Sequence, residues 1–281
     1  MVFYSKSENE KTDNKAESKT DAEFRKSHTY VEHPEHASKL GSVHHKHHDE
    51  PGVRVPTGIP GFDELIEGGI KLHNTILIEG GAGTGKSIFA VQFLYNGIEQ
   101  FNENGVYISF EEEREDFYSN MRRFGWDLEK LEQEKKFLFL RYFPEQVEKV
   151  LASGGGIIHD AIDAIKAKRL VIDSITAFTL LHNDELTKRE SLLTLFRLIK
   201  KWGCTALVIG QPEITDPNSQ PFNLLEFECD GVIRLYHHLE HNIRQRTIEV
   251  YKMRGTKHAE KTFSLEITAK GIVVYPENSN I

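Results

Sequence analysis

Hydrophobic positions after residue 52 fall into short apolar runs that alternate with longer stretches of helical period. Each run predicts a strand, and each stretch in which apolar side chains recur every three or four residues predicts a helix. Strands are expected over residues 74–79, 105–110, 136–141, 170–173 and 205–210. Helices are expected over residues 86–101, 115–124, 157–167 and 185–202. This alternation predicts an α/β domain whose mostly parallel sheet carries helices on both faces.

The pattern changes after Gln211. Later apolar runs are joined by short polar turns, with no helical stretch between them, and predict strands over residues 231–236, 247–253, 262–267 and 272–275. We expect these strands to extend the same sheet in antiparallel fashion at its C-terminal edge. No internal repeat is visible.

Residues 1–50 differ from the rest of the chain in composition. They hold 7 of the 14 histidines, and their apolar side chains are scattered without a period. Such a segment buries too little surface to offset its ordering entropy, so it predicts a disordered, His-rich polar tail ahead of a folded domain over residues 51–281. The tract HHKHH at residues 44–48 lacks preorganised ligand spacing, which favours a solvated low-complexity tract over a metal site.

Composition and charge narrow the class of protein. The chain has 281 residues and a net charge of -8, which argues against a main affinity for nucleic-acid phosphates, although a local basic groove stays open. Two cysteines cannot form a disulfide framework, and no secretory signal is visible. The apolar runs fall far short of the ~20 residues of a membrane span. We expect a cytoplasmic protein without membrane insertion.

Residues 80–87 read GGAGTGKS and fit the pattern G-x-x-x-x-G-K-[ST]. A strand is expected before this loop and a helix after it, which is the context of a phosphate-binding loop rather than an ordinary glycine-rich turn. Lys86 should reach the β- and γ-phosphates, and the Ser87 hydroxyl should ligate Mg²⁺. The residues expected to hold the nucleotide are Gly80, Gly81, Ala82, Gly83, Thr84, Gly85, Lys86 and Ser87.

Three carboxylates follow predicted strands and are candidates for metal and water chemistry. Asp173 ends an apolar strand, as the second metal-site carboxylate of such nucleotide sites does, although an Asp before Ser174 could also cap a helix. Glu111 and Glu112 follow another strand, at the edge where ligands bind in open α/β sheets. A close carboxylate pair raises the proton affinity of one member, which suits a base. A solvated acidic start of the next helix is the alternative, and it fits Glu113 better.

Five stretches together resemble the single-domain KaiC-like ATPases of the RecA superfamily. They are GIPGFDELIEGGI at 58–70, FAVQFLYNGI at 89–98, GVYISFEEE at 105–113, RRFGWDLEKL at 122–131 and KMRGTKH at 252–258. The resemblance runs from about residue 55 to residue 276. It implies a RecA-like P-loop NTPase fold that binds ATP with Mg²⁺.

The resemblance also implies roles for individual residues. Glu111 and Glu112 correspond to catalytic carboxylates, and Gln211 corresponds to a polar sensor. Lys252 and Arg254 correspond to cations that reach the nucleotide of a neighbouring subunit in a homo-oligomer, a hexameric ring in the family. The residues themselves leave open whether these cations act within the chain or between chains, and exposed strand charges would be the simpler interpretation.

The resemblance also bears on kinase activity. Some relatives phosphorylate themselves on an adjacent Ser-Thr pair, but the corresponding positions here are Glu226 and Phe227, neither of which accepts a phosphoryl group. This favours an ATP hydrolase over a serine/threonine autokinase.

Three functions compete. The first is a slow ATPase in an oligomeric ring that regulates or assembles protein partners, which the sequence does not identify. The second is an ATP-bound assembly switch without hydrolysis, and the glutamate pair favours the first over it. The third is a recombinase-like DNA-binding ATPase, which residues 213–228 disfavour because they contain no Lys or Arg.

Overall fold

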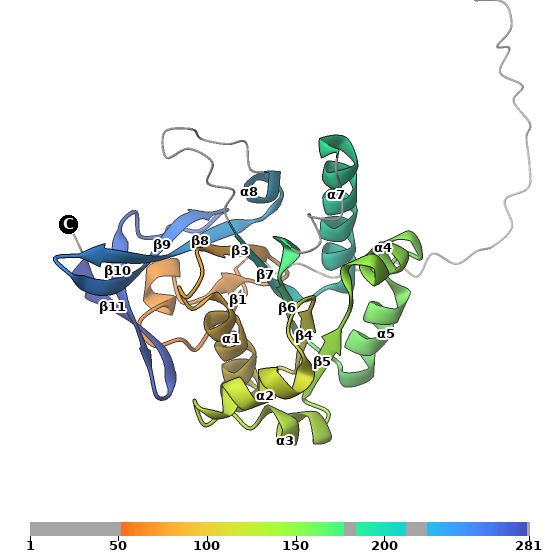
Figure 1. Ribbon diagram of the computed structural model, residues 1–281, viewed down its shortest axis with the longest axis horizontal. Coiled ribbons are helices and arrows are strands. Elements are labelled where there is room, and N and C mark those ends of the chain that lie inside the picture. Colours follow the sequence, from red (N-terminus) through yellow and green to blue (C-terminus); the bar gives the residue numbers. More distant parts are fainter. Residues whose placement is uncertain (1–51, 177–183, 212–223, 280–281) are drawn as a thin grey trace, which may run out of the picture. The chain divides into compact units, whose positions relative to one another are not determined.

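The structure is a computed structural model that describes residues 52–176, 184–211 and 224–279. The tail expected at residues 1–50, with its His-rich tract, lies outside the described residues, as do residues 212–223, which include most of the segment 213–228 that lacks Lys and Arg. The described residues build a nine-stranded sheet with helices on both faces (Figure 1).

The sheet has the strand order β11-β10-β9-β8-β3-β7-β6-β4-β5. Its parallel part comprises β3 (Thr75–Gly80), β4 (Gly105–Ser109), β5 (Phe137–Arg141), β6 (Arg169–Asp173), β7 (Thr205–Gly210) and β8 (Gly231–Glu240). Antiparallel strands follow at one edge: β9 (Ile243–Met253), β10 (Thr262–Thr268) and β11 (Gly271–Ser279). This confirms the fold class that the hydrophobic pattern predicts.

Alternate residues of the central strands feed two hydrophobic cores. On β3, Ile76 and Ile78 face one core and Leu77 faces the other. The first core is covered by α1 (Lys86–Phe101), α2 (Arg114–Arg122) and α3 (Leu128–Gln133), together with the short helix η1 (Asp63–Ile66) and the strand pair β1 (Arg54–Val55) and β2 (Ile70–Lys71). The second core is covered by α4 (Pro144–Ala152), α5 (Gly156–Ile165), α7 (Glu185–Trp202) and α8 (Leu224–Glu228).

Some elements are longer or more numerous than the hydrophobic pattern predicts. The β8–β9 hairpin continues to the pair Glu240 and Ile243, because backbone pairing persists where side chains such as Leu239 and Ile243 are exposed and contribute no buried apolar pattern. Helices α3, α4 and α8 are too short to show a clear apolar period. At α3, the Asp127 side chain accepts a hydrogen bond from the backbone N–H of Lys130 and caps the helix.

Strand register brings the carboxyl ends of the central strands to one edge of the sheet. Glu79 at the end of β3 pairs with Gly210 of β7, and Ser109 at the end of β4 pairs with Asp173 of β6. The segments that follow these strands therefore meet at this edge, which we call the loop edge. Among the described helices, none has both the length and the apolar character needed to cross a bilayer.

Candidate nucleotide site

The glycine-rich loop joins β3 to α1 at the loop edge. Its backbone needs glycine at defined points: Gly83 and Gly85 have φ of 74° and 105°, a region that side chains disfavour. At Gly80 a Cβ atom would lie 2.5 Å from the carbonyl oxygen of Leu235 on β8, so the start of the loop packs directly on that strand. The loop geometry therefore depends on the glycines that the motif requires.

Within the described chain, the backbone N–H groups of residues 81–85 donate no hydrogen bond. Such a run of free donors ahead of a helix N-terminus is suited to phosphate oxygens. Lys86 Nζ donates to the carbonyl oxygens of Gly80 and Gly81 at 2.8 and 2.9 Å, which keeps its ammonium group over the loop. Burial lowers the pKa of Lys86, and the carboxylates of Asp173 and Glu111 offset part of that change.

Ser87 and Asp173 are 86 residues apart in the chain but hydrogen-bonded in the structure. Ser87 Oγ donates to Asp173 Oδ2 at 2.6 Å, and the buried Tyr107 hydroxyl donates to the same oxygen at 2.6 Å. Burial raises the pKa of Asp173, and the hydrogen bonds from Ser87 and Tyr107 offset part of the rise. The peptide bond between Asp173 and Ser174 is cis.

The two glutamates line a cavity beside this pair. The cavity has a volume of ≈ 280 Å³ and is lined by Ser87, Ser109, Glu111, Glu112 and Asp173. Glu111 Oε1 accepts a hydrogen bond from Ser174 Oγ at 2.7 Å. Glu112 Oε1 accepts one from Asn120 Nδ2 at 2.8 Å.

The environment of Glu112 raises the pKa of its carboxyl group. Burial is the largest cause that raises the pKa of Glu112, and the negative charges of Asp173 and Asp116 add to it, while the Asn120 hydrogen bond lowers it. Glu112 and Asp173 thus both have a raised carboxyl pKa, with burial as the main cause.

The donor set of this cavity fits Mg²⁺. Hydroxyl and carboxylate oxygens are hard ligands, and Mg²⁺ is usually bound by one or two carboxylates together with substrate phosphates rather than by an all-protein cage. The described residues contain no group of three or more His, Cys, Asp and Glu side chains arranged to hold a metal ion. Ser87 and Asp173 are the side chains that would hold the ion, beside the phosphate loop.

Gln211 also lies at the loop edge. It follows Gly210, the partner of Glu79 on β3, so it is level with the first glycine of the loop. Its backbone N–H donates to Thr176 Oγ1 at 2.9 Å, and its side chain is exposed.

Lys252 and Arg254 lie at the other end of the strands, opposite the loop edge. They flank Met253, which pairs with Gly231, which in turn pairs with Ile76 near the start of β3. Four residues of strand, roughly 13 Å, separate Ile76 from the beginning of the loop. The structure thus does not bring these cations to the chain's own phosphate loop.

Both cations bind the carboxyl end of α8 instead. Lys252 Nζ donates to the carbonyl oxygens of Glu226 and Cys229 at 2.6 and 2.8 Å, and Arg254 Nη2 donates to that of Phe227 at 2.7 Å. Cations are favourable at the carboxyl end of a helix, where carbonyl groups lack partners. The Arg254 side chain remains about half exposed, at 52%.

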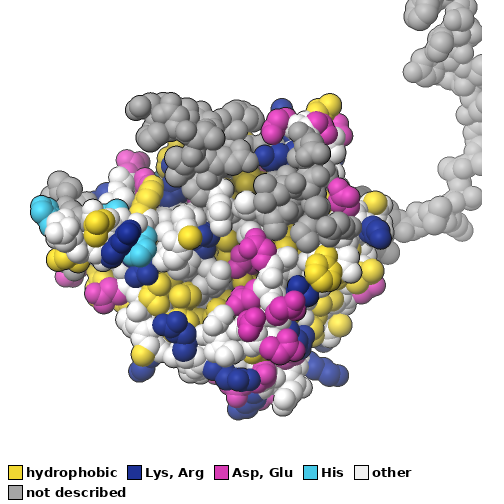
Figure 2. Space-filling model, viewed as in Figure 1, with side chains coloured by type: hydrophobic (Ala, Val, Ile, Leu, Met, Phe, Trp, Pro, Cys, Tyr) yellow, Lys and Arg dark blue, Asp and Glu magenta, His cyan; other side chains and the backbone are white. Residues whose placement is uncertain are grey.

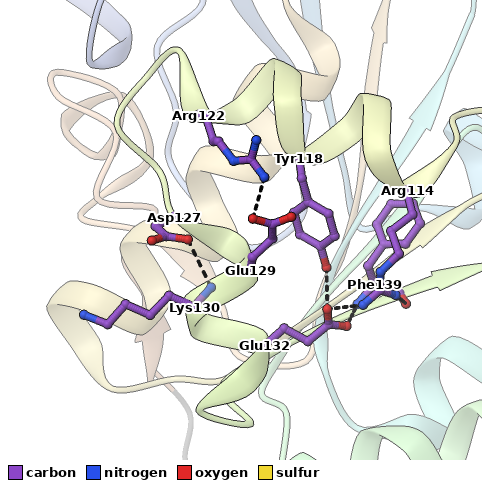
Figure 3. Close-up of polar contacts among 8 residues, drawn as sticks. All are labelled: Arg114, Tyr118, Arg122, Asp127, Glu129, Lys130, Glu132 and Phe139. Carbon is purple, nitrogen blue, oxygen red and sulfur yellow. Dashed lines mark hydrogen bonds and ion pairs between the residues drawn. The ribbon is translucent and has the colours of Figure 1, made fainter.

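A larger cavity, of ≈ 430 Å³, lies between α2 and α3, away from the loop. Three of its five lining side chains are charged, and one of them, Glu132, accepts from the Tyr118 hydroxyl at 2.7 Å and forms an ion pair with Arg114 (Figure 3). In the region of α2 and α3, acidic and basic side chains are intermixed on the surface (Figure 2). The smaller cavity, and not this larger one, is lined by Ser87 of the loop motif and by Asp173.

The sequence does not point to four residues in or beside the smaller cavity, which are Tyr107, Ser109, Asn120 and Ser174. Tyr107 lies within a strand pattern and reads as an ordinary core aromatic. Asn120 is eight residues beyond its partner Glu112, on the next helix. In the sequence, Ser174 indicates only a possible helix start after Asp173. The sequence offers one indication of its role, which is its position directly after the candidate metal carboxylate Asp173.

A glycine loop between a central strand and a helix, with Ser87, Asp173 and two glutamates at the same edge of a mostly parallel sheet, defines a P-loop domain of the RecA-like class. The chain belongs to the KaiC-like ATPases: a family model described as "ATPase: KaiC" matches residues 55–279. The described fold carries one such domain.

Similar proteins agree with this membership. A UPF0273 protein of Pyrococcus furiosus is 40% identical over 237 residues, which cover 80% of this chain and 94% of that protein. The circadian clock oscillator protein KaiC of Synechococcus elongatus is 35% identical over 231 residues, 80% of this chain but 44% of that protein. The crystal structure of a KaiC-like protein from Pyrococcus horikoshii has 40% sequence identity and a TM-score of 0.71, with 80% of this chain and 99% of that chain covered.

Proposed function

We propose that this protein is a Mg²⁺-dependent ATP hydrolase that turns over slowly within a homo-oligomer, and that its nucleotide state regulates or assembles protein partners. The observation that carries the proposal is the hydrogen bond of 2.6 Å between Ser87 and Asp173 beside a cavity lined by Glu111 and Glu112. A cytoplasmic location, as expected from the composition, is part of the proposal, and so is a disordered tail over residues 1–50.

Nucleotide binding is proposed to use the loop and three side chains. The free N–H groups of residues 81–85 would cradle the phosphates, and Lys86 would leave the loop carbonyls to bind the β- and γ-phosphates. Ser87 and Asp173 would hold Mg²⁺, which supplies positive charge to the phosphates when bound. Gln211, level with the loop, is proposed to contact the nucleotide as a sensor.

Water activation is proposed for the glutamate pair. Glu112 is suited to accept a proton, because burial raises the pKa of its carboxyl group and Asn120 orients it. Glu111, oriented by Ser174, would position the water and leave the proton to its neighbour.

Lys252 and Arg254 are proposed to act on the nucleotide of a neighbouring subunit. Their distance from the chain's own loop supports action between chains, and the exposure of Arg254 leaves its guanidinium group accessible. An arginine supplied in this way stabilises the charge of the transferring phosphoryl group. The site would then be complete only in an oligomer, for which a ring is the simplest closed arrangement of head-to-tail contacts.

The test measures assembly, ATP binding and turnover together. Size-exclusion chromatography with light scattering is run with and without ATP and Mg²⁺, and phosphate release is followed on the same samples. We expect a larger assembly with ATP and slow phosphate release that requires Mg²⁺. Glu112→Gln should keep ATP binding and lower turnover about 10²–10⁴-fold.

Glu113→Gln is the matched control, because Glu113 adjoins the pair but forms an ion pair with Arg141 and does not line the cavity. It should retain turnover. ATP-dependent assembly without phosphate release in the parent protein would instead identify the non-hydrolysing switch. Release of phosphate at the parent rate by Glu112→Gln would reject the assignment of the base.

A further inference from the structure

A buried carboxylate lies directly before the phosphate loop and is paired with an arginine. Glu79, the residue before Gly80, is 2% exposed, and its Oε2 lies 3.2 Å from Nε of Arg234 on β8. The same guanidinium group donates through Nη2 to Glu226 Oε1 on α8 at 2.8 Å. Arg234 thus connects β3, which leads into the loop, with α8, whose carboxyl end binds Lys252 and Arg254.

Strand register explains why these groups meet. Glu79 and Arg234 are direct partners in the β3–β8 pair, so their side chains project to the same face. One residue further along, Gly80 pairs with Leu235, whose carbonyl oxygen leaves no room for a side chain on the loop glycine. A displacement of Gly80, the first residue of the loop, would therefore displace β8 next to Arg234.

A register shift in the β8–β9 pair affects how β9 side chains contact Arg234 and α8. The β8–β9 register shifts between Val232 and Ile233, which pair with Lys252 and Val250 and leave Tyr251 as an extra residue. A bulge of this kind redirects side chains. Lys252 is thereby directed to α8, and the guanidinium carbon of Arg234 lies 3.5 Å from the ring centroid of Tyr251.

Helix α8 is the element that this connection can bias. With five residues it is too short to be stable alone, so its folded state depends on tertiary ties. Those ties include the ion pair of Glu226 with Arg234 and the hydrogen bonds of Lys252 and Arg254 to its terminal carbonyl groups. Short, externally tied helices open locally at low free energy.

We propose that Arg234 is a positioning residue that transmits nucleotide occupancy from the chain's own phosphate loop through Glu79 to α8, and so sets the position of Lys252 and Arg254. The proposal rests on the function proposed above, in which those two cations serve the neighbouring nucleotide. A bound triphosphate immobilises the loop base and adds negative charge beside Glu79, which holds the guanidinium group in place. A fixed Arg234 then tightens α8 through Glu226.

Cys229 provides an internal probe of α8. It is fully buried at the carboxyl end of this helix, and its carbonyl oxygen accepts from Lys252, so its thiol reacts only when that end opens. The other cysteine, Cys204, is removed as Cys204→Ala to leave a single thiol. The rate at which a disulfide reagent labels Cys229 is measured with and without Mg²⁺ and a non-hydrolysable ATP analogue, and analogue binding is measured calorimetrically on the same samples.

We expect the analogue to slow labelling about fivefold or more, the lower end of measured couplings between sites. Glu226→Gln should lose most of this effect while it still binds the analogue, because it removes the charge that pairs with Arg234. Glu228→Gln, the same change on the same helix at a residue without an ion pair among the described side chains, should keep the effect.

Two results would overturn the proposal and leave the ATPase intact. One is analogue binding with no decrease in the labelling rate of the parent. The other is an equal decrease in Glu226→Gln and Glu228→Gln. A chain that does not bind the analogue at all would instead reject the proposed function and this inference with it.

Discussion

Tyr107 and Asp173 lie on neighbouring strands, and the phenol hydroxyl donates to the carboxylate at 2.6 Å from a fully buried ring. Tyr107 pairs with Val171, two residues before Asp173, so its side chain reaches along the sheet to the loop edge. The Asp173 carboxylate therefore accepts hydrogen bonds from two hydroxyl groups, those of Ser87 and Tyr107. Partners of this kind orient metal-binding carboxylates and tune their affinity.

Tyr107→Phe removes only this donor. We expect the Mg²⁺ concentration for half-maximal phosphate release to rise about 10-fold or more, as for other partners of metal-binding groups. ATP affinity without Mg²⁺ should not change. Tyr118→Phe is the control, since it also deletes a hydroxyl that donates to a carboxylate, that of Glu132, and neither residue lines the cavity. An unchanged Mg²⁺ dependence in Tyr107→Phe would contradict the assignment.

Turnover should fall at acidic pH through protonation of Glu112. Burial raises the pKa of this carboxyl group above its ordinary value, so the loss of kcat/KM should begin at a higher pH than for an ordinary glutamate. The sign for stability is the opposite: a raised carboxyl pKa contributes stability at low pH, which is lost as pH rises through the folded-state value. Acid inactivation in this range should therefore occur without a decrease in the melting temperature. Inactivation that coincides with unfolding would argue against this cause.

Lys86→Ala should abolish ATP binding, because it removes the positive charge expected on the β- and γ-phosphates. Calorimetric titration measures the affinity directly. Lys130→Ala on α3 deletes an exposed ammonium group and should bind ATP like the parent. Retained micromolar affinity in Lys86→Ala would place the nucleotide elsewhere.

Two inactive variants should restore activity when they form mixed assemblies. Replacing both Glu111 and Glu112 by Gln removes the base, and Arg254→Ala removes charge stabilisation that is worth roughly 10³–10⁵ in rate in related systems. Some interfaces of a mixed ring pair intact glutamates with an intact neighbouring arginine. Phosphate release is measured after the variants are dissociated and reassembled together, with each variant reassembled alone as the control. No recovery in assemblies whose mixed mass is verified would reject action between subunits.

Deletion of residues 1–50 should leave melting temperature and turnover unchanged, because the composition of this segment offers little apolar surface to a core. Thermal unfolding and phosphate release of the shortened and full-length chains provide the comparison. A large decrease in melting temperature would show that the tail packs on the domain.

Local features of the sequence were sufficient for the loop and for most elements. The spacing of glycines, Lys86 and Ser87 predicts a phosphate loop because backbone conformation and helix polarity are decided within a few residues. The ranges predicted for α1, α7 and β7 agree with the structure, since their apolar periods are long or unbroken. Short elements such as α8 escaped prediction because their stability comes from distant partners.

By itself, then, the sequence determined the fold class, the family resemblance and the residue types of the candidate site. Only the tertiary structure decided that Ser87, Tyr107 and Asp173 share hydrogen bonds, and that Glu79 meets Arg234. It also decided that Lys252 and Arg254 lie at the edge opposite the loop. The physical reason is strand register: pairing between strands far apart in the chain sets which side chains are neighbours, and no local period encodes that pairing.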